Sequence, residues 1–64
     1  MPSTVIAKIE YDEPSQELII TFVSGRKYVY QAVPPDIYDR FARARVKGTF
    51  FNDHIRDCYN YMQV

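Results

Sequence analysis

The chain is poor in the residues on which several classes of protein depend. Its single cysteine, Cys58, cannot form a disulfide within the chain, and a lone thiol is typical of a reducing compartment. No apolar stretch approaches the roughly 20 residues of a membrane span. Residues 1–4 also lack the basic and apolar character of a signal peptide. We therefore expect a cytoplasmic protein that makes no contact with a membrane.

Glycine and net charge are also scarce. Glycine occurs only at positions 25 and 48, which leaves no glycine-rich loop for phosphate binding. Eight basic and eight acidic side chains give a formal net charge of zero, which argues against a broad polyanion-binding surface. Binding of a charged partner would then depend on a local cluster of charges.

Apolar residues, by contrast, are plentiful for a chain of 64 residues. They make up 47% of the sequence, with six tyrosines and four phenylalanines among them, which is ample for a folded protein. The length predicts one domain, residues 1–64, with a marginal core. Domains of this size often gain stability from a disulfide, a metal or a partner subunit, and the first of these is excluded here.

Three segments with strand character precede a helical half. Residues 5–11 alternate between apolar and polar side chains, which indicates a half-buried strand. After a turn favoured by Pro14, residues 18–22 form a second, β-branched strand. Gly25 interrupts it, and residues 26–32 form the third. The pattern predicts a three-stranded antiparallel meander.

The loop between the second and third strands decides which way Tyr28 and Tyr30 face. A two-residue turn at positions 24 and 25 directs both tyrosines to the face that carries Ile19. A three-residue loop, with its glycine left-handed in a bulge, directs them to the face of Leu18 and Ile20. We favour the second register because it collects most apolar residues on one face. That face carries Val5, Ala7, Ile9, Tyr11, Leu18, Ile20, Phe22, Tyr28, Tyr30 and Ala32.

Two helices are expected after the sheet. Pro35 suits the first turn of a helix, and Ile37 and Phe41 recur at helical spacing until Gly48, a natural stop. A second helical stretch follows, in which an apolar stripe would cover the sheet. The stripe consists of Phe51, Ile55, Cys58 and Met62. The predicted fold class is α+β, a three-stranded antiparallel meander followed by two helices packed on one face of the sheet.

An ordered series of residues resembles a known family. The series is Leu18, Ile20, Phe22, Gly25, Tyr28, Tyr30, then Val33-Pro34, Tyr38, Ala44, Gly48, Phe51-Asn52 and Ile55. The chain resembles the KTSC domain, a module named for the C-terminus of some lysyl-tRNA synthetases and also found as a stand-alone bacterial protein. Val46 departs from the family, which tends to carry a small polar residue there. The resemblance implies a stand-alone version and, by association with the synthetase, RNA binding; it implies no defined activity.

A local basic cluster supports RNA binding. Arg40, Arg43 and Lys47 fall at helical spacing on one flank of the first expected helix, and Arg26 and Lys27 lie at the hairpin. Such a stripe can contact phosphates, and tyrosines between basic residues can stack on unpaired bases. The competing interpretation is an ordinary solvated helix face with intrahelical ion pairs. The leading hypothesis is a non-catalytic module that binds RNA, with tRNA as one candidate, and that places these cations on phosphates.

Tyr28 and Tyr30 allow two interpretations as well. On an open sheet they would offer stacking surfaces for bases. On the helix-facing side they would be core residues whose hydroxyl groups reach the rim. The favoured register predicts the second arrangement.

The outer face of the sheet suggests an alternative function. Ile6, Ile19 and Val29 would form an apolar patch there, which could pair two copies into a homodimer or dock a protein partner. Scattered surface hydrophobic residues are an equally good interpretation, because they are common on soluble proteins.

Catalysis is the weakest interpretation of the sequence. His54 and Cys58 are four residues apart, a spacing at which a helix can form a thiol–imidazole pair. Cys58, however, belongs to the expected apolar stripe, where a free cysteine behaves as a small hydrophobic residue. Asp53 and Asp57 nearby do not make a convincing metal site. The sequence therefore predicts no enzymatic activity, no metal and no cofactor.

Overall fold

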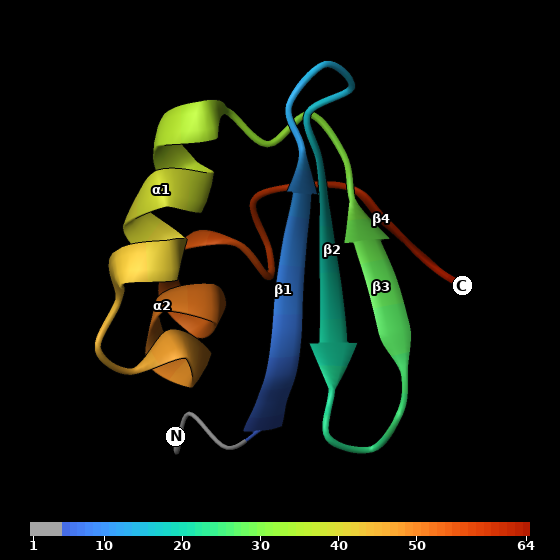
Figure 1. Cartoon of the computed structure of the whole chain (residues 1–64), viewed down its shortest axis with the longest axis vertical. Helices are drawn as coiled ribbons and strands as arrows, with labels where there is room; N and C mark the ends of the chain where they lie inside the picture. Colours follow the sequence, from blue (N-terminus) through green and yellow to red (C-terminus); the bar gives the residue numbers. More distant parts are fainter. Residues whose placement is uncertain (1–4) are drawn as a thin grey trace.

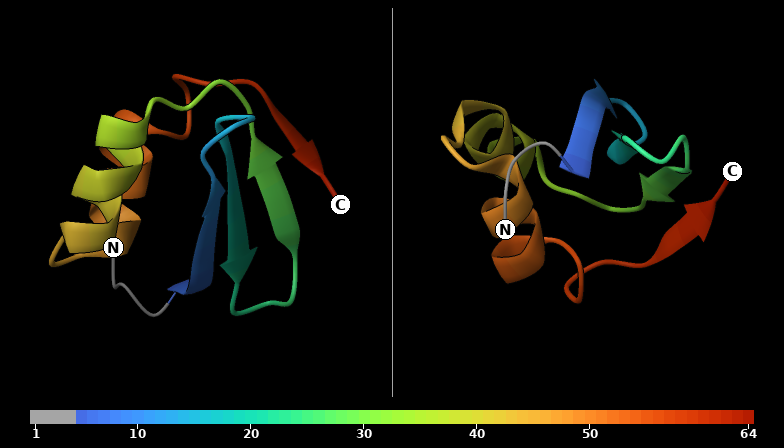
Figure 2. Two further views of the ribbon diagram at one scale, coloured as in Figure 1. Left: turned by 45° about the horizontal axis from the view of Figure 1, so that its top comes forward. Right: turned by 90° about the horizontal axis from the view of Figure 1, so that it is seen from below.

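A computed structural model of the chain describes residues 5–64, which form one antiparallel sheet with two helices on one side of it (Figure 1). The elements are β1 (Ile6–Asp12), β2 (Glu17–Phe22), β3 (Lys27–Tyr30), α1 (Pro35–Arg43), α2 (Lys47–His54) and β4 (Tyr61–Gln63). The strands lie in the order β1-β2-β3-β4, and every neighbouring pair is antiparallel. Figure 2 shows that both helices lie to the same side of the sheet, so the α+β class is confirmed.

The fourth strand corrects the expected three-stranded sheet. Val29 in β3 pairs with Met62 in β4, so the end of the chain adds to the sheet and not to a helix. The expected apolar stripe is wrong beyond residue 55, because α2 ends at His54 and both Cys58 and Met62 are exposed. The turn begins at Ile55, whose φ of −122° departs from helical geometry.

The hairpin between β2 and β3 has the favoured register. The Phe22 N–H donates to the Arg26 carbonyl at 2.9 Å, and Gly25 adopts the left-handed φ of +93° that this loop requires. Leu18 consequently pairs with Tyr30, and Ile20 pairs with Tyr28. Both tyrosines face the helices, as predicted.

A bulge in β1 changes which residues of that strand face inward. The pairing shifts between Ile6 and Lys8, so Ala7 is the extra residue. Ile6 is paired with Phe22 and packs against the core, whereas Ala7 is exposed. The prediction that Ile6 lies on the outer face and Ala7 on the inner face is therefore wrong.

A second break in the alternation follows β3. Ala32 has a φ of +57° and is exposed, although it was predicted to face inward. The left-handed residue turns the chain so that Val33 takes the inward position and is fully buried. The Val33 N–H donates to the Gln16 carbonyl at 2.9 Å, which ties this segment to the β1–β2 turn.

The helices are divided differently from the prediction. Gly48 was expected to end the first helix, but α1 ends at Arg43 and Gly48 is a buried residue in the first turn of α2. Ala44 and Val46 have extended backbones, with ψ of 136° and 98°, which stop the first helix four residues early. Lys47 therefore belongs to a different helix from the α1 arginines.

The core lies between the inner face of the sheet and the two helices. Its buried side chains are Leu18, Ile20, Tyr30, Val33, Phe41, Phe51 and Ile55. Neither helix within residues 5–64 is long and apolar enough to cross a membrane. Residues 1–4, on which the expected lack of a signal peptide rested, lie outside the described part of the chain.

Candidate functional site

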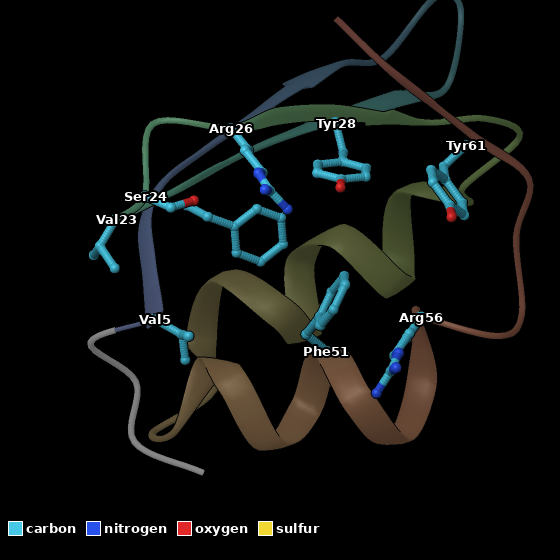
Figure 3. A pocket seen from close by; sticks show the side chains of 9 residues that line it. Val5, Val23, Ser24, Arg26, Tyr28, Phe51, Arg56 and Tyr61 are labelled. Atoms are coloured by element: carbon cyan, nitrogen blue, oxygen red, sulfur yellow. The ribbon is translucent and has the colours of Figure 1, made fainter.

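A pocket opens between the inner face of the sheet and α2, next to the β2–β3 hairpin (Figure 3). Its volume is about 380 Å³. Side chains from the hairpin, β3, α2, the turn after α2 and β4 line it: Val5, Phe22, Val23, Ser24, Arg26, Tyr28, Phe51, Arg56 and Tyr61. The pocket thus joins segments that are far apart in the sequence.

Aromatic rings form much of the pocket wall. The register of the hairpin turns Tyr28 inward, and the pairing of β4 with β3 brings Tyr61 beside it, with 5.4 Å between the ring centroids. Phe22 and Phe51 meet edge to face at 5.6 Å behind them. Tyr61 is 54% exposed, so one wall of the pocket is an aromatic ring that solvent can reach.

Two arginines give the pocket a positive charge. Arg26 comes from the sheet wall and Arg56 from the opposite wall, after α2 (Figure 3). None of the lining residues is a carboxylate, and the ion pairs within residues 5–64 involve neither arginine. Arg56 donates one hydrogen bond to the side-chain oxygen of Asn52 at 3.4 Å, which leaves most of its N–H groups available. Such a pocket attracts anions.

Tyr30 lies beside the pocket and connects it to the core. Burial raises the pKa of Tyr30 to about 12, and the neighbouring Tyr61 and Tyr28 add to the rise. The Asp57 carboxylate also raises this pKa, whereas the positive charge of Arg56 acts on it in the opposite direction. The Tyr30 phenol is therefore protonated at neutral pH.

The cations predicted to bind phosphates come from two helices and from the hairpin. On α1, the Arg43 side chain pairs with Asp39 at 3.4 Å, and Arg40 lies over the Phe50 ring at 5.6 Å. Lys47, at the start of α2, donates to the Ala44 carbonyl at 3.4 Å.

The basic pair at the hairpin is divided between the two faces of the sheet. Arg26 lines the pocket, whereas Lys27 pairs with Thr21 and shares its outward face. Of the five basic residues singled out from the sequence, the pocket contains only Arg26.

The family tyrosines are both inward, but they differ in exposure. Tyr30 is 3% exposed and packs on Phe51 with 5.5 Å between ring centroids, so it is a core residue as predicted. Tyr28 is half-buried, and its ring meets Phe22 at 5.5 Å. Because Tyr28 also lines the pocket, it contributes to both the fold and the site.

The outer face carries a narrower apolar patch than predicted. Ile19 pairs with Val29, and Val29 pairs with Met62, so these three side chains form one row across β2, β3 and β4. Met62 is 55% exposed. We call this row the outer row; Ile6 is not part of it, because the bulge in β1 turns that residue inward.

The thiol and imidazole singled out from the sequence are not paired on a helix. The His54 ring packs on Phe50, with 4.5 Å between centroids, and Cys58 lies beyond the end of α2 on the surface. Within residues 5–64, no three His, Cys, Asp or Glu side chains gather in a way that could hold a metal ion.

The sequence-based search did not identify the pocket residues Arg56 and Tyr61, and it identified Phe51 only as part of an apolar stripe. The signal for β4 was weak: Tyr59 and Tyr61 flank the polar Asn60, but the apolar Met62 and the polar Gln63 break the alternation. The helical spacing of the apolar residues from 51 to 62 competed with it. Arg56 carries no local signal, since it reaches the pocket only through the turn after α2.

The architecture defines a small α+β domain in which two helices connect the third and fourth strands of an antiparallel sheet. The sequence pattern of the KTSC domain matches residues 2–63, and the chain belongs to this family. A solved KTSC domain protein from Yersinia pestis has a TM-score of 0.87 and 32% sequence identity, covering 92% of this chain and 83% of that one.

Relatives include both a large enzyme and small proteins. A lysine–tRNA ligase from Nostoc punctiforme is 34% identical over 61 residues, which cover 95% of this chain but 11% of the ligase. An uncharacterised protein from Stutzerimonas stutzeri is 31% identical over 65 residues, covering all of this chain and 92% of that protein. The family therefore occurs both as a small part of a ligase and as nearly the whole of a small protein.

Proposed function

We propose that the chain is a non-catalytic accessory domain that binds RNA, and tRNA in particular, through the pocket between the sheet and α2. One observation supports this most strongly. The pocket combines two arginines, neither of which forms an ion pair within residues 5–64, with aromatic rings, and none of its lining residues is Asp or Glu. Arginines contact phosphates, and exposed aromatic rings stack on unpaired bases. The ligase relative suggests tRNA as the class of RNA.

The pocket is a better candidate than the basic flank predicted from the sequence. Arg40, Arg43 and Lys47 each already contact another group of the protein. Arg56 also donates one hydrogen bond, to Asn52, but it lines, together with Arg26, a cavity in which a phosphate can be placed. The proposal keeps a cytoplasmic location, where tRNA occurs and where the lone Cys58 stays reduced.

A titration of tRNA and of a short single-stranded RNA over a range of salt concentrations tests the proposal. Two phosphate contacts on a single strand predict a slope of about −1.4 in the plot of log affinity against log salt. Arg26→Gln and Arg56→Gln should each reduce that slope by about 0.7. Arg43→Gln, at an exposed arginine paired with Asp39, is the matched control and should leave the slope unchanged. Absence of binding, or binding that does not depend on salt, would refute the proposal.

The outer row supports a second candidate, a homo-oligomerising or protein-docking module. Ile19, Val29 and the exposed Met62 lie side by side in register on the outward face. Burying such a row against a second copy would remove apolar surface from water and add to a marginal core. Light scattering at high protein concentration tests for self-association.

Two variants on the same strand and face make that test specific. Ile19→Glu places a charge in the outer row and should dissociate a dimer. Thr21→Glu places the same charge beside Lys27, outside the row, and should leave a dimer intact. A wild-type chain that is monomeric at all concentrations would exclude self-association.

A further inference from the structure

The dimensions of the pocket limit what part of an RNA it can hold. Pockets for small ligands have volumes of about 300 to 1,000 Å³, and this one, at about 380 Å³, is near the lower limit. A pocket of this size suits one nucleotide unit and is too small for two paired nucleotides with their riboses and phosphates. The RNA segment that enters would therefore be unpaired.

The two arginines are arranged on opposite walls of the pocket. Arg26 belongs to the sheet wall and Arg56 to the wall formed after α2, with the Phe51 ring between them (Figure 3). Within an RNA strand each internal nucleotide is flanked by two phosphates, one on each side of the ribose. Cations on opposite walls match this arrangement better than they match a single terminal anion.

Aromatic rings from β3 and β4 line the pocket beside the two positive groups (Figure 3). Tyr28 and Tyr61 present rings that are tilted by 46° to one another, and Tyr61 is 54% exposed. A base that enters can stack on Tyr61 while the Tyr28 ring closes the inner side. Stacking of a base on an aromatic side chain adds to affinity and depends little on the sequence.

We propose that the pocket holds a single unpaired nucleotide within an RNA strand, with its base on Tyr61 and its two flanking phosphates on Arg26 and Arg56. This inference rests on the proposed RNA-binding function and specifies its ligand. It predicts that the domain binds single strands, loops and bulges and rejects continuous duplex.

Small ligands test the inference without a full RNA. Uridine 3′,5′-bisphosphate, uridine 5′-monophosphate, uridine and inorganic phosphate are each titrated into the protein, with binding followed by calorimetry. The bisphosphate should bind most tightly, and affinity should fall about tenfold for each phosphate removed. Equal affinity for the bisphosphate and for inorganic phosphate would overturn the inference, since the pocket would then be a simple anion site.

Substitutions at one position test the stacking role. Tyr61→Leu should weaken bisphosphate binding at least fivefold, whereas Tyr61→Phe should retain it because the ring is kept. Met62→Leu is the matched control, because its side chain lies on the opposite face of β4. Unchanged binding by Tyr61→Leu would overturn the stacking role, and Tyr61→Phe keeps the test valid if the leucine variant is unstable.

Two further outcomes separate this inference from its alternatives. Tight binding of tRNA together with no binding of the bisphosphate would overturn the single-nucleotide site and leave RNA binding intact. A phosphotyrosine peptide also combines a ring with an anion. If it bound more tightly than the bisphosphate, the pocket would instead belong to a protein partner, and the inference would be wrong.

Discussion

The two faces of the sheet differ in what they contain, although the same strands build both. The inner face carries the core and the aromatic, arginine-lined pocket, whereas the outer face carries one apolar row with Lys27 and Thr21 beside it. Neighbours along a strand are therefore separated in role: Arg26 belongs to the pocket and Lys27 to the outer face. In so small a domain, two residues that are adjacent in the sequence can thus lie on different faces, one in the candidate pocket and the other on the outer face.

The largest effect that tests this division is on stability. Leu18 and Ile19 are adjacent in β2, but Leu18 is fully buried and Ile19 faces outward, half-buried. Leu18→Ala should lower the free energy of unfolding by about 2 to 5 kcal/mol, because it opens a cavity in the core. Ile19→Ala should cost about 1 kcal/mol or less, since its neighbourhood is partly open to solvent. Urea denaturation measures both.

This pair also informs the second candidate function. If Ile19→Ala destabilised the protein as much as Leu18→Ala, the outer row would have to be covered in solution. The loss would then increase with protein concentration, because a dimer would be its cause.

A second stability effect depends on pH and involves Tyr30 on the inner face. Burial raises the pKa of Tyr30 to about 12, above its ordinary value of about 10. The stability that this provides is fully present below about pH 10 and is lost as the pH rises towards 12, because the unfolded chain releases the proton first. Tyr30→Phe should flatten the decline over that range, as followed by thermal unfolding. An equal loss of stability over that range in the wild type and in Tyr30→Phe would contradict a raised pKa for Tyr30.

How far the sequence predicts this fold depends on the segment. The hairpin register could be predicted from the sequence, because only one of the two loop types places the apolar residues on one face. The left-handed Gly25 fits that loop. The bulge at Ala7 and the left-handed conformation of Ala32 could not be predicted from the sequence. Alanine gives no local signal for either conformation, and both are imposed by tertiary contacts.

The candidate site could be predicted only in part, for a similar reason. Arg26 was singled out as a cation at the hairpin, and Tyr28 was predicted to face inward because the register of its strand could be worked out. Arg56 and Tyr61 depend on where α2 ends and on the return of the chain beside β3. The residues of that segment are compatible with both a helical and an alternating spacing. Whether the segment forms a helix or a strand therefore depends on its packing against Tyr30, which no local sequence pattern predicts.

The next effect compares two neighbouring cations for RNA affinity. Arg26→Gln should weaken binding of a short single-stranded RNA roughly tenfold, through loss of a charged hydrogen bond to phosphate. Lys27→Gln removes the same charge from the outer face and should change affinity less than twofold at moderate salt. Fluorescence anisotropy measures both affinities. Equal losses would show that the charge acts at a distance and not by contact in the pocket.

The last pair of effects, which includes the smallest one expected, concerns the two left-handed residues at either end of β3. A Cβ at Gly25 would meet no atom within 4 Å, so Gly25→Ala should cost about 1–2 kcal/mol from backbone strain alone. Ala32, with a φ of +57°, already bears such strain. Ala32→Gly should stabilise the domain by about 0.5 kcal/mol, because relief of strain exceeds the added entropy of the unfolded chain. Urea denaturation should show a lower free energy of unfolding for Gly25→Ala and a higher one for Ala32→Gly. A change in the same direction for both variants would contradict this account.

The side-chain NMR signals of the arginines give the most direct test of the central claim, that RNA enters the pocket. Each guanidinium reports its own surroundings as a short single-stranded RNA is added. We expect the Nε–H signals of Arg26 and Arg56 to move together and to saturate, while those of Arg40 and Arg43 on α1 stay in place. Movement of the α1 arginines with the pocket arginines unchanged would contradict the account.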